Sequence, residues 1–267
     1  RRLTVGKRPG TFPLYPTEFI SRLSEIGRLD YTAMTLPRTS PDDLDAVERN
    51  RLRDFIRQKR GEERIAELED AEFDKALGLV QETRDGVTPT VAGLLSIGKR
   101  NVIRRQLPGA GAVFEDFSGA NRGVSEDFVL PLLDCLDALL LRFRARQVES
   151  EWMDGLVRVA VPAYSEHAFR EALVNAFCHR DYARPGRISV RMLDDGLAIT
   201  SPGGFMSGLT PETLLTAPSR SRNPLLAEIF RRIGLTESCG RGIERIAEGN
   251  LRYGRPLPDF SESDEET

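Results

Sequence analysis

Alternation of apolar and polar residues is clearest between residues 187 and 193. Ile188, Val190 and Met192 fall on one face of an extended segment, because successive side chains of a strand point to opposite sides. An Asp-Asp-Gly turn follows at 194–196, and residues 197–200 form the return strand. The pattern therefore predicts a β-hairpin here.

Apolar residues at helical spacing predict a helix over 128–146 and another over 165–179, which Ser165 caps. Pro224 begins a third helix, which Gly234 ends, and a short helix follows from Gly242 to about residue 247. Weaker signals predict further helices at 17–26, 40–57, 62–68, 71–78, 91–97 and 211–215, and strands at 3–5, 79–83, 112–117 and 156–160. Helices and strands alternate along the chain, so we expect a mixed α/β (α+β) fold.

A polar stretch at 149–155 separates two regions of the chain. We place a domain boundary there, which gives a first region over 1–149, a second over 150–258 and a tail over 259–267. The last seven residues are mostly acidic, a composition typical of disorder.

Charge and composition argue against several classes of function. The 267 residues carry 38 Lys+Arg and 41 Asp+Glu, a net charge of −3, which argues against the whole chain being one broad phosphate-binding surface. No apolar run is long enough to span a bilayer and none resembles a secretory leader, so we expect no membrane partner. The three cysteines lack metal-ligand spacing, and we interpret them as reduced thiols of a cytoplasmic protein.

The candidate chemistry begins with Glu171 and Asn175. They are four residues apart, so they project from one face of the predicted helix. The carboxylate could orient and deprotonate a water, and the amide oxygen could bind Mg²⁺, which needs few protein ligands when phosphates and waters complete its octahedron. The alternative is an ordinary polar pair on a helix surface.

Two glycine-rich turns follow. Ser201, Pro202, Gly203 and Gly204 come after the return strand, where glycines let the backbone approach a ligand. The turn at 240–243 precedes a helix, whose first N–H groups favour anions. Both segments could equally be simple turns.

Between these turns lies a polar segment over 209–222. It could be a mobile lid in which Arg220 or Arg222 reaches a phosphate, because a guanidinium matches phosphate oxygens. A solvated loop is the alternative interpretation.

These motifs occur in a recognisable order, namely Arg-Glu-Ala-Leu-Val-Asn-Ala over 170–176, His-Arg-Asp-Tyr over 179–182, Ser-Pro-Gly-Gly over 201–204, Arg-Asn-Pro-Leu-Leu over 222–226 and Gly-Arg-Gly-Ile over 240–243. The series resembles the GHKL-type ATPase module called RecG-like C-terminal. That module follows a divergent AlbA-type, Schlafen-like DNA-binding domain in prokaryotic transcriptional regulators. Residues 89–99 resemble a helix late in the AlbA-type domain.

The resemblance implies an AlbA-like remnant before residue 150, and after it an α/β sandwich with helices on one face of a mixed sheet. Glu171 would stand at the position of the general base and Asn175 at that of the Mg²⁺ ligand. Gly203 and Gly204 would match the first glycine box, with Ser201 beside them, and Gly240 and Gly242 the second. His179 and Asp181 belong to the family's His-Arg-Asp-Tyr run. They could hold the end of the helix, or His179 could act as a base.

Two departures from the family pattern matter. The acid that reads the adenine amino group is missing, because Ser201 or Pro202 stands in its place. The early part of the AlbA-type domain and the winged helix that often follows the module are also missing. We therefore expect a fragment of a longer protein, with DNA contacted through regions outside it.

Three hypotheses follow. The first is a nucleotide-responsive regulator that binds ATP and Mg²⁺, with hydrolysis left open. The second is a degenerate module that serves homodimerisation or partner binding. The third is DNA contact by Arg1, Arg2, Lys7 and Arg8. No G-x-x-x-x-G-K-[ST] loop is present, so a P-loop helicase motor is excluded.

Overall fold

The computed structural model describes residues 3–7, 10–59, 61–84, 86–119, 123–154, 156–211, 213–214, 220–236, 242–261 and 263. Its strands are β1 (Leu3–Lys7), β2 (Gly10–Leu14), β3 (Val80–Thr83), β4 (Gly86–Pro89), β5 (Ala112–Asp116), β6 (Val124–Phe128), β7 (Glu149–Asp154), β8 (Val157–Pro162), β9 (Ile188–Met192) and β10 (Leu197–Thr200). Its α-helices are α1 (Pro16–Glu25), α2 (Ala46–Lys59), α3 (Glu63–Ala66), α4 (Asp70–Ala76), α5 (Val91–Ile97), α6 (Arg100–Gln106), α7 (Leu132–Ala145), α8 (Glu166–His179), α9 (Pro224–Arg232) and α10 (Gly242–Arg252). Two 3₁₀ turns lie at Tyr31–Ala33 and Pro41–Asp43.

The central sheet has four strands in the order β10-β9-β5-β6. The two outer pairings are antiparallel, whereas β5 and β9 run parallel, with Ala112 opposite Ile188 and Phe114 opposite Val190. Those four residues are buried, while the residues between them are half-buried. One face of the sheet therefore packs against the core.

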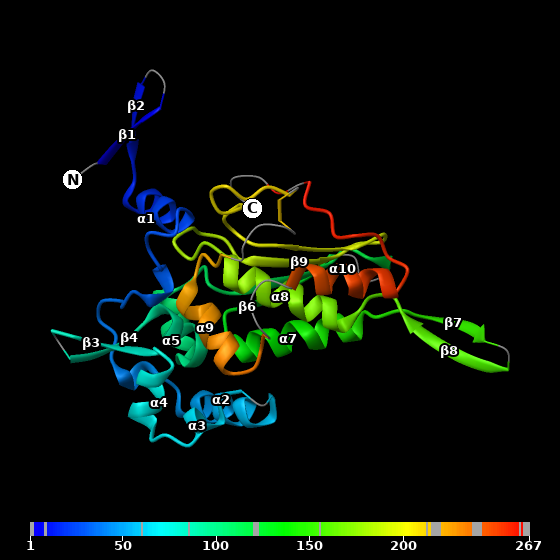
Figure 1. The fold of residues 1–267 in the computed structure, drawn as a ribbon, viewed down its shortest axis with the longest axis horizontal. Helices are drawn as coiled ribbons and strands as arrows, with labels where there is room; N and C mark the ends of the chain where they lie inside the picture. The colour runs from blue at the N-terminus through cyan, green and yellow to red at the C-terminus, as the bar shows by residue number, and fades with distance from the viewer. Residues whose placement is uncertain are drawn as a thin grey trace.

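Helices cover that face of the sheet (Figure 1). Helix α7 packs against β5, and α8 packs against β10, α7 and α10. Phe143 of α7 and Phe169 of α8 stack with their ring centroids 4.0 Å apart. The predicted mixed α/β fold, with helices on one face of a mixed sheet, is confirmed.

The sheet combines strands from both sides of the boundary that the sequence predicted at residue 149. One hydrophobic cluster likewise includes residues from Leu44 to Leu235. The two hairpins β1–β2 and β7–β8 each form a separate two-stranded sheet and project from the body of the molecule (Figure 1). The boundary remains a prediction about the sequence, while the core and the central sheet are continuous across it.

The structure corrects one predicted helix start and adds detail to two other segments. Phe128 ends strand β6 rather than beginning a helix, because the following helix starts only after Pro131, which lacks an N–H and has a fixed φ. Residues 149–154, where the sequence placed the boundary, form strand β7 paired with β8. The strand near the N-terminus has a partner in β2, which follows it in the chain.

The helix predicted at 211–215 lies partly outside the described residues. Residues 211, 213 and 214 form turns. The predicted acidic tail, over 259–267, also lies largely outside them.

Candidate functional site

Helix α8 carries the carboxylate and the amide that the sequence singled out. The Ser165 hydroxyl accepts the Ala168 N–H at 3.2 Å and fixes the start of the helix, as predicted. Phe169, Leu173 and Phe177 are buried against the core. Glu171 and Asn175 lie on another side of the helix and are half-buried, so an adjacent element must cover them.

That element is helix α10, which packs directly on α8. A Cβ at Gly242 would come within 2.8 Å of Asn175 Nδ2, and a Cβ at Gly249 within 2.7 Å of Ala168 Cβ. Residue numbers rise along α10 as they fall along α8, so the helices run antiparallel. Glycine permits this close approach at both points because it has no side chain.

An ion pair lies between the two glycine contacts. Arg245 Nη1 is 3.5 Å from Glu171 Oε1, and the two side chains are 22% and 12% exposed. The carboxylate that the sequence nominated as a general base therefore has a cation beside it. This arrangement differs from one in which the carboxylate faces an open cleft.

The first glycine turn lies at the C-terminal end of α8. The Asp181 N–H donates to the Pro202 carbonyl at 2.7 Å. Gly203 has a φ of +95°, and a Cβ there would lie 2.6 Å from Asp181 Cβ. Gly203 is therefore needed both for its backbone conformation and for the close contact. Ser201 and Gly204 are half-buried in the same turn.

Arg222 joins this turn to α8. Its Nε donates to the His179 carbonyl at 3.1 Å, and its Nη2 donates to the Gly204 carbonyl at 2.7 Å. The residue is 3% exposed. In this conformation the guanidinium holds the turn in place instead of extending to solvent. Arg220, the other predicted phosphate ligand, is exposed.

Gly240 and the segment 215–219 lie outside the described residues. The structure thus brings together Glu171, Asn175 and Gly242. It places the 201–204 turn beyond them, at the end of the same helix.

The His-Arg-Asp-Tyr run forms a buried polar cluster. Arg180 donates to the carbonyls of Gly109 at 2.7 Å and Gly186 at 2.6 Å. Asp181 accepts hydrogen bonds from the Ser21 hydroxyl and, at 3.0 Å, from the Ala183 N–H. These contacts tie the end of α8 to α1 and to the segments that flank β5 and β9.

The environment of His179 also favours a structural role. Burial, reinforced by the nearby Arg222 guanidinium, lowers the pKa of His179 to about 4. The imidazole is therefore neutral near pH 7. Of the two roles that the sequence left open for this run, the contacts support holding the helix end.

Sequence reasoning missed two residues of the α8–α10 contact, Arg245 and Gly249. A signal was present, since Gly242 and Gly249 are seven residues apart and thus share one face of a helix. The predicted helix stopped near residue 247, short of the second glycine. Ser21, which bonds Asp181, could not have been found from a local pattern.

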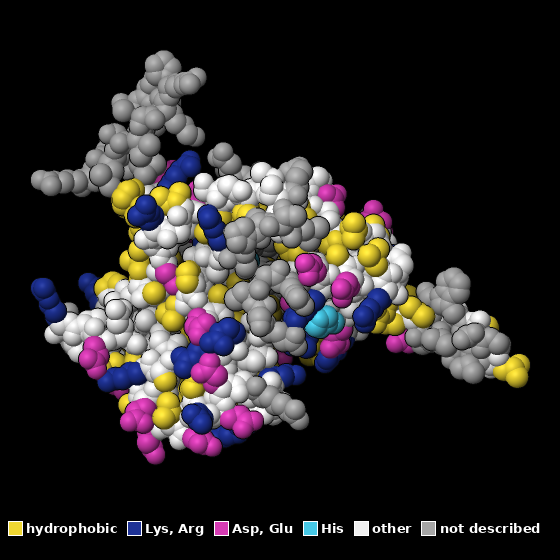
Figure 2. All heavy atoms as spheres, viewed as in Figure 1, with side chains coloured by type: hydrophobic (Ala, Val, Ile, Leu, Met, Phe, Trp, Pro, Cys, Tyr) yellow, Lys and Arg dark blue, Asp and Glu magenta, His cyan; other side chains and the backbone are white. Residues whose placement is uncertain are grey.

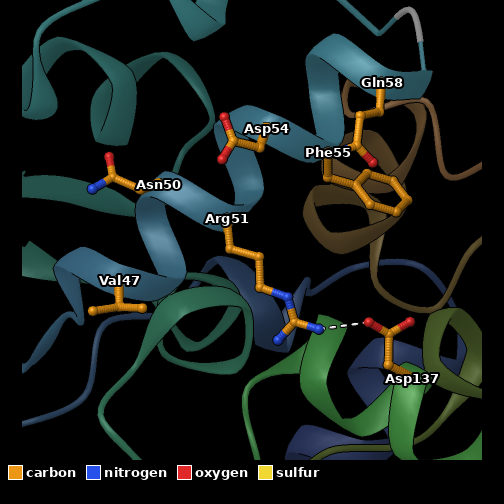
Figure 3. A pocket seen from close by; sticks show the side chains of 7 residues that line it. All are labelled: Val47, Asn50, Arg51, Asp54, Phe55, Gln58 and Asp137. Atoms are coloured by element: carbon orange, nitrogen blue, oxygen red, sulfur yellow. Dashed lines mark hydrogen bonds and ion pairs between the residues drawn. The ribbon is translucent and has the colours of Figure 1, made fainter.

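A separate surface hollow lies between α2 and α7 (Figure 3). Its lining consists of Val47, Asn50, Arg51, Asp54, Phe55, Gln58 and Asp137. Arg51 extends across it and lies 2.5 Å from Asp137. None of the residues predicted for the nucleotide site lines this hollow.

Surface charge is mixed in sign on the visible face. Basic and acidic side chains alternate over α2–α4 at the lower left (Figure 2). The ion pairs Lys75–Glu82 and Arg57–Asp54 belong to this region. None of the helices in the described part of the chain is long and apolar enough to cross a lipid bilayer.

Two family models match parts of the chain. Residues 186–267 match the family described as "Putative ATP-dependent DNA helicase recG C-terminal". Residues 22–111 match a family described as "Domain of unknown function (DUF8451)". The C-terminal part of the expected resemblance is therefore supported, and the AlbA-type assignment of the first region remains a prediction.

A solved structure is similar over nearly the whole chain. It is the DIP2311 protein from Corynebacterium diphtheriae, with 25% sequence identity and a TM-score of 0.68. The match covers 96% of this chain and 50% of that protein, so this chain spans half of its length. None of the curated proteins matches the chain.

Proposed function

We propose that the α8–α10 region binds a nucleotide, with Mg-ATP as the first candidate. The observation that carries the proposal is the contact between Asn175 and Gly242, which lie far apart in the sequence, with Glu171 one helical turn away. An acid, an amide and the glycine start of a helix are thereby assembled at one place. The family match over 186–267 supports the part of this proposal that lies in α10, whereas Glu171 and Asn175 precede the matched residues.

Each group has a chemical role in this proposal. The N–H groups at the start of α10 favour phosphate oxygens, because the eleven-residue helix directs its positive end toward them. The Asn175 oxygen and the Glu171 carboxylate are the hard donors that Mg²⁺ prefers. Mg²⁺, when bound, offsets the charge of the phosphates.

The donor set fits an ion that arrives with its nucleotide. Among the described residues, no group of three or more His, Cys, Asp or Glu side chains could hold a metal. Mg²⁺ bound through one or two protein oxygens, with phosphates and waters as its other ligands, is consistent with that finding.

A non-catalytic role is the second candidate, and one observation favours it. Glu171 lies 3.5 Å from Arg245, so its carboxylate already has a charged partner in this conformation. Hydrolysis would require Glu171 to exchange this partner for a water. A module that binds nucleotide without turnover, or that serves homodimerisation or partner contact, would need no such exchange.

We further propose that the longer protein is a DNA-associated regulator, in which nucleotide binding here changes DNA-binding parts outside this chain. The net charge of −3 and the mixed charge of the face drawn in Figure 2 support placing DNA contact elsewhere.

Calorimetry with Mg-ATP tests the nucleotide proposal. We expect saturable binding by the wild type and at least about tenfold weaker binding by Asn175→Ala, because a ligand of the bound ion is lost. Asn101→Ala, at an exposed position of α6, is the matched control and should bind like the wild type. No saturable binding by correctly folded wild type would refute the proposal.

A further inference from the structure

The two ends of α10 are held to the molecule very differently. At its C-terminal end, Gly249 is buried against Ala168 and Ser165 of α8. Just beyond the helix, Arg255 Nε donates to the Ala163 carbonyl at 2.9 Å, and its guanidinium lies 4.7 Å from the Tyr164 ring centroid. These contacts anchor the C-terminal end beside the start of α8.

Among the described residues, the N-terminal end of α10 contacts α8 through a glycine and an ion pair. Gly242 contributes no side chain, and the next ion pair along the helix is Arg245 with Glu171. Gly249 is the buried residue of this helix, whereas the shorter α9 buries Leu226, Ile229 and Phe230 at 1% exposure or less. Burying large apolar side chains stabilises a helix on its neighbours, and the side chains of Ile243 and Ile246 in α10 are only half-buried, so α10 buries less apolar surface than α9.

The same end of α10 also closes the proposed nucleotide site. Gly242 lies against the Asn175 amide, so no ion or phosphate fits between them in this conformation. Arg245 Nη1 lies 3.5 Å from Glu171 Oε1, so a positive charge already stands beside the carboxylate that would contact the ion. Ligand entry therefore requires the first turns of α10 to move away from α8.

We propose that α10 is a cover, hinged at its Gly249 end and held closed by Arg245 on Glu171, which must open for nucleotide to bind. This inference rests on the proposed function. Arg245 would then be an inhibitory residue, since every contact that it makes with Glu171 favours the closed state. A ligand that binds only the open state shifts the population toward it.

The test uses the full chain with three substitutions in α10. Arg245→Gln removes the charge, Arg245→Lys keeps it, and Arg252→Gln is the matched control at an exposed position of the same helix. Amide hydrogen exchange over 242–248, referenced to α9, reports opening without any ligand. Calorimetry with Mg²⁺ and the non-hydrolysable analogue AMP-PNP reports affinity.

We expect Arg245→Gln to speed exchange over 242–248 by about two- to fivefold and to tighten AMP-PNP binding by a similar factor, the range for a partly exposed ion pair. Arg245→Lys should have an exchange rate and an AMP-PNP affinity nearer to those of the wild type. Arg252→Gln should have the wild-type values of both. An unchanged rate of amide exchange over 242–248 in Arg245→Gln would overturn the proposal that α10 is a cover. Weaker AMP-PNP binding by Arg245→Gln would also overturn the proposal, because it would show that Arg245 contacts the ligand.

The two proposals fail separately. Faster exchange in Arg245→Gln without detectable binding by any variant would support the hinged cover and refute the nucleotide site beneath it.

Discussion

Gly242 lies so close to Asn175 that a Cβ at position 242 would come within 2.8 Å of the Asn175 amide nitrogen and 3.1 Å of its oxygen. The backbone at Gly242 has no left-handed φ, so space and not conformation demands glycine here. The neighbouring atoms belong to a side chain that can turn away. Substitution at this position should therefore affect binding as well as folding.

Gly242→Ala tests the effect of this close contact on folding and on binding. We expect a loss of about 1 kcal/mol in the free energy of unfolding, typical of mild overpacking, because the Asn175 side chain can rotate. Mg-ATP affinity should rise by up to about fivefold, the equivalent of that 1 kcal/mol, because the added Cβ crowds the closed state of α10 and not the open state. Denaturant titration and calorimetry measure the two effects. Gly196→Ala, with open space around its Cβ, should change neither.

Gly93→Ala should be far more damaging. A Cβ there would lie 1.9 Å from the Leu79 carbonyl oxygen, which already accepts the Thr90 N–H at 2.9 Å. A backbone carbonyl held in this way cannot move aside, so helix α5 must separate from the start of β3. We expect a loss of about 3 kcal/mol or more in urea denaturation. A loss below about 1 kcal/mol would show that α5 can shift without cost.

The neutral His179 imidazole predicts a pH dependence of stability. Its folded pKa of about 4 lies below the ordinary value of about 6.5, so the unfolded chain takes up the proton first as the pH falls. The contribution of His179 to the free energy of unfolding is fully present above pH 6.5. It is lost progressively toward pH 4, by on the order of 3 kcal/mol.

Unfolding free energies at pH 7 and pH 5 for His179→Gln check this prediction. The unfolding free energy should fall less from pH 7 to pH 5 in His179→Gln than in the wild type. His167→Gln, at an exposed position of the same helix, should keep the wild-type drop. Equal drops in His179→Gln and wild type would contradict the assignment.

Asp181→Asn tests the cluster at the end of α8. The carboxylate is 1% exposed, and Oδ2 lies 3.4 Å from Arg184 Nε and 3.6 Å from Arg222 Nη1. Removing its charge leaves the buried Arg222 guanidinium without this counter-charge, so we expect a loss of about 3 kcal/mol in unfolding free energy. Asp195→Asn, in the exposed β9–β10 turn, is the control and should be neutral.

The sequence predicted elements whose signals are local. The hairpin at 188–200 alternates in polarity around a glycine turn, and α8 has its cap at Ser165. Helix α9 begins at Pro224, and Gly234 follows it with a φ of +76°. Each of these signals lies within a few residues of the element that it defines, which explains why these predictions were confirmed.

Features that depend on distant partners could not be predicted in this way. Strand β6 has a polar composition, and its pairing with β5 defines it as a strand. The parallel pairing of β5 with β9 crosses the intervening helices α7 and α8. The Arg245–Glu171 pair likewise depends on how α10 packs, which no residue near Glu171 encodes.

The pairing of β5 with β9 also constrains how this protein can be divided. A fragment that began at residue 150 would keep β9 and β10 but lose β5 and β6, half of its central sheet. It would present the bare backbone of β9 to solvent, where another copy could pair with it and precipitate. Any shorter version that stays monomeric must therefore start upstream of Ala112. For the same reason, a chimera with a relative must take both halves of the sheet from the same protein.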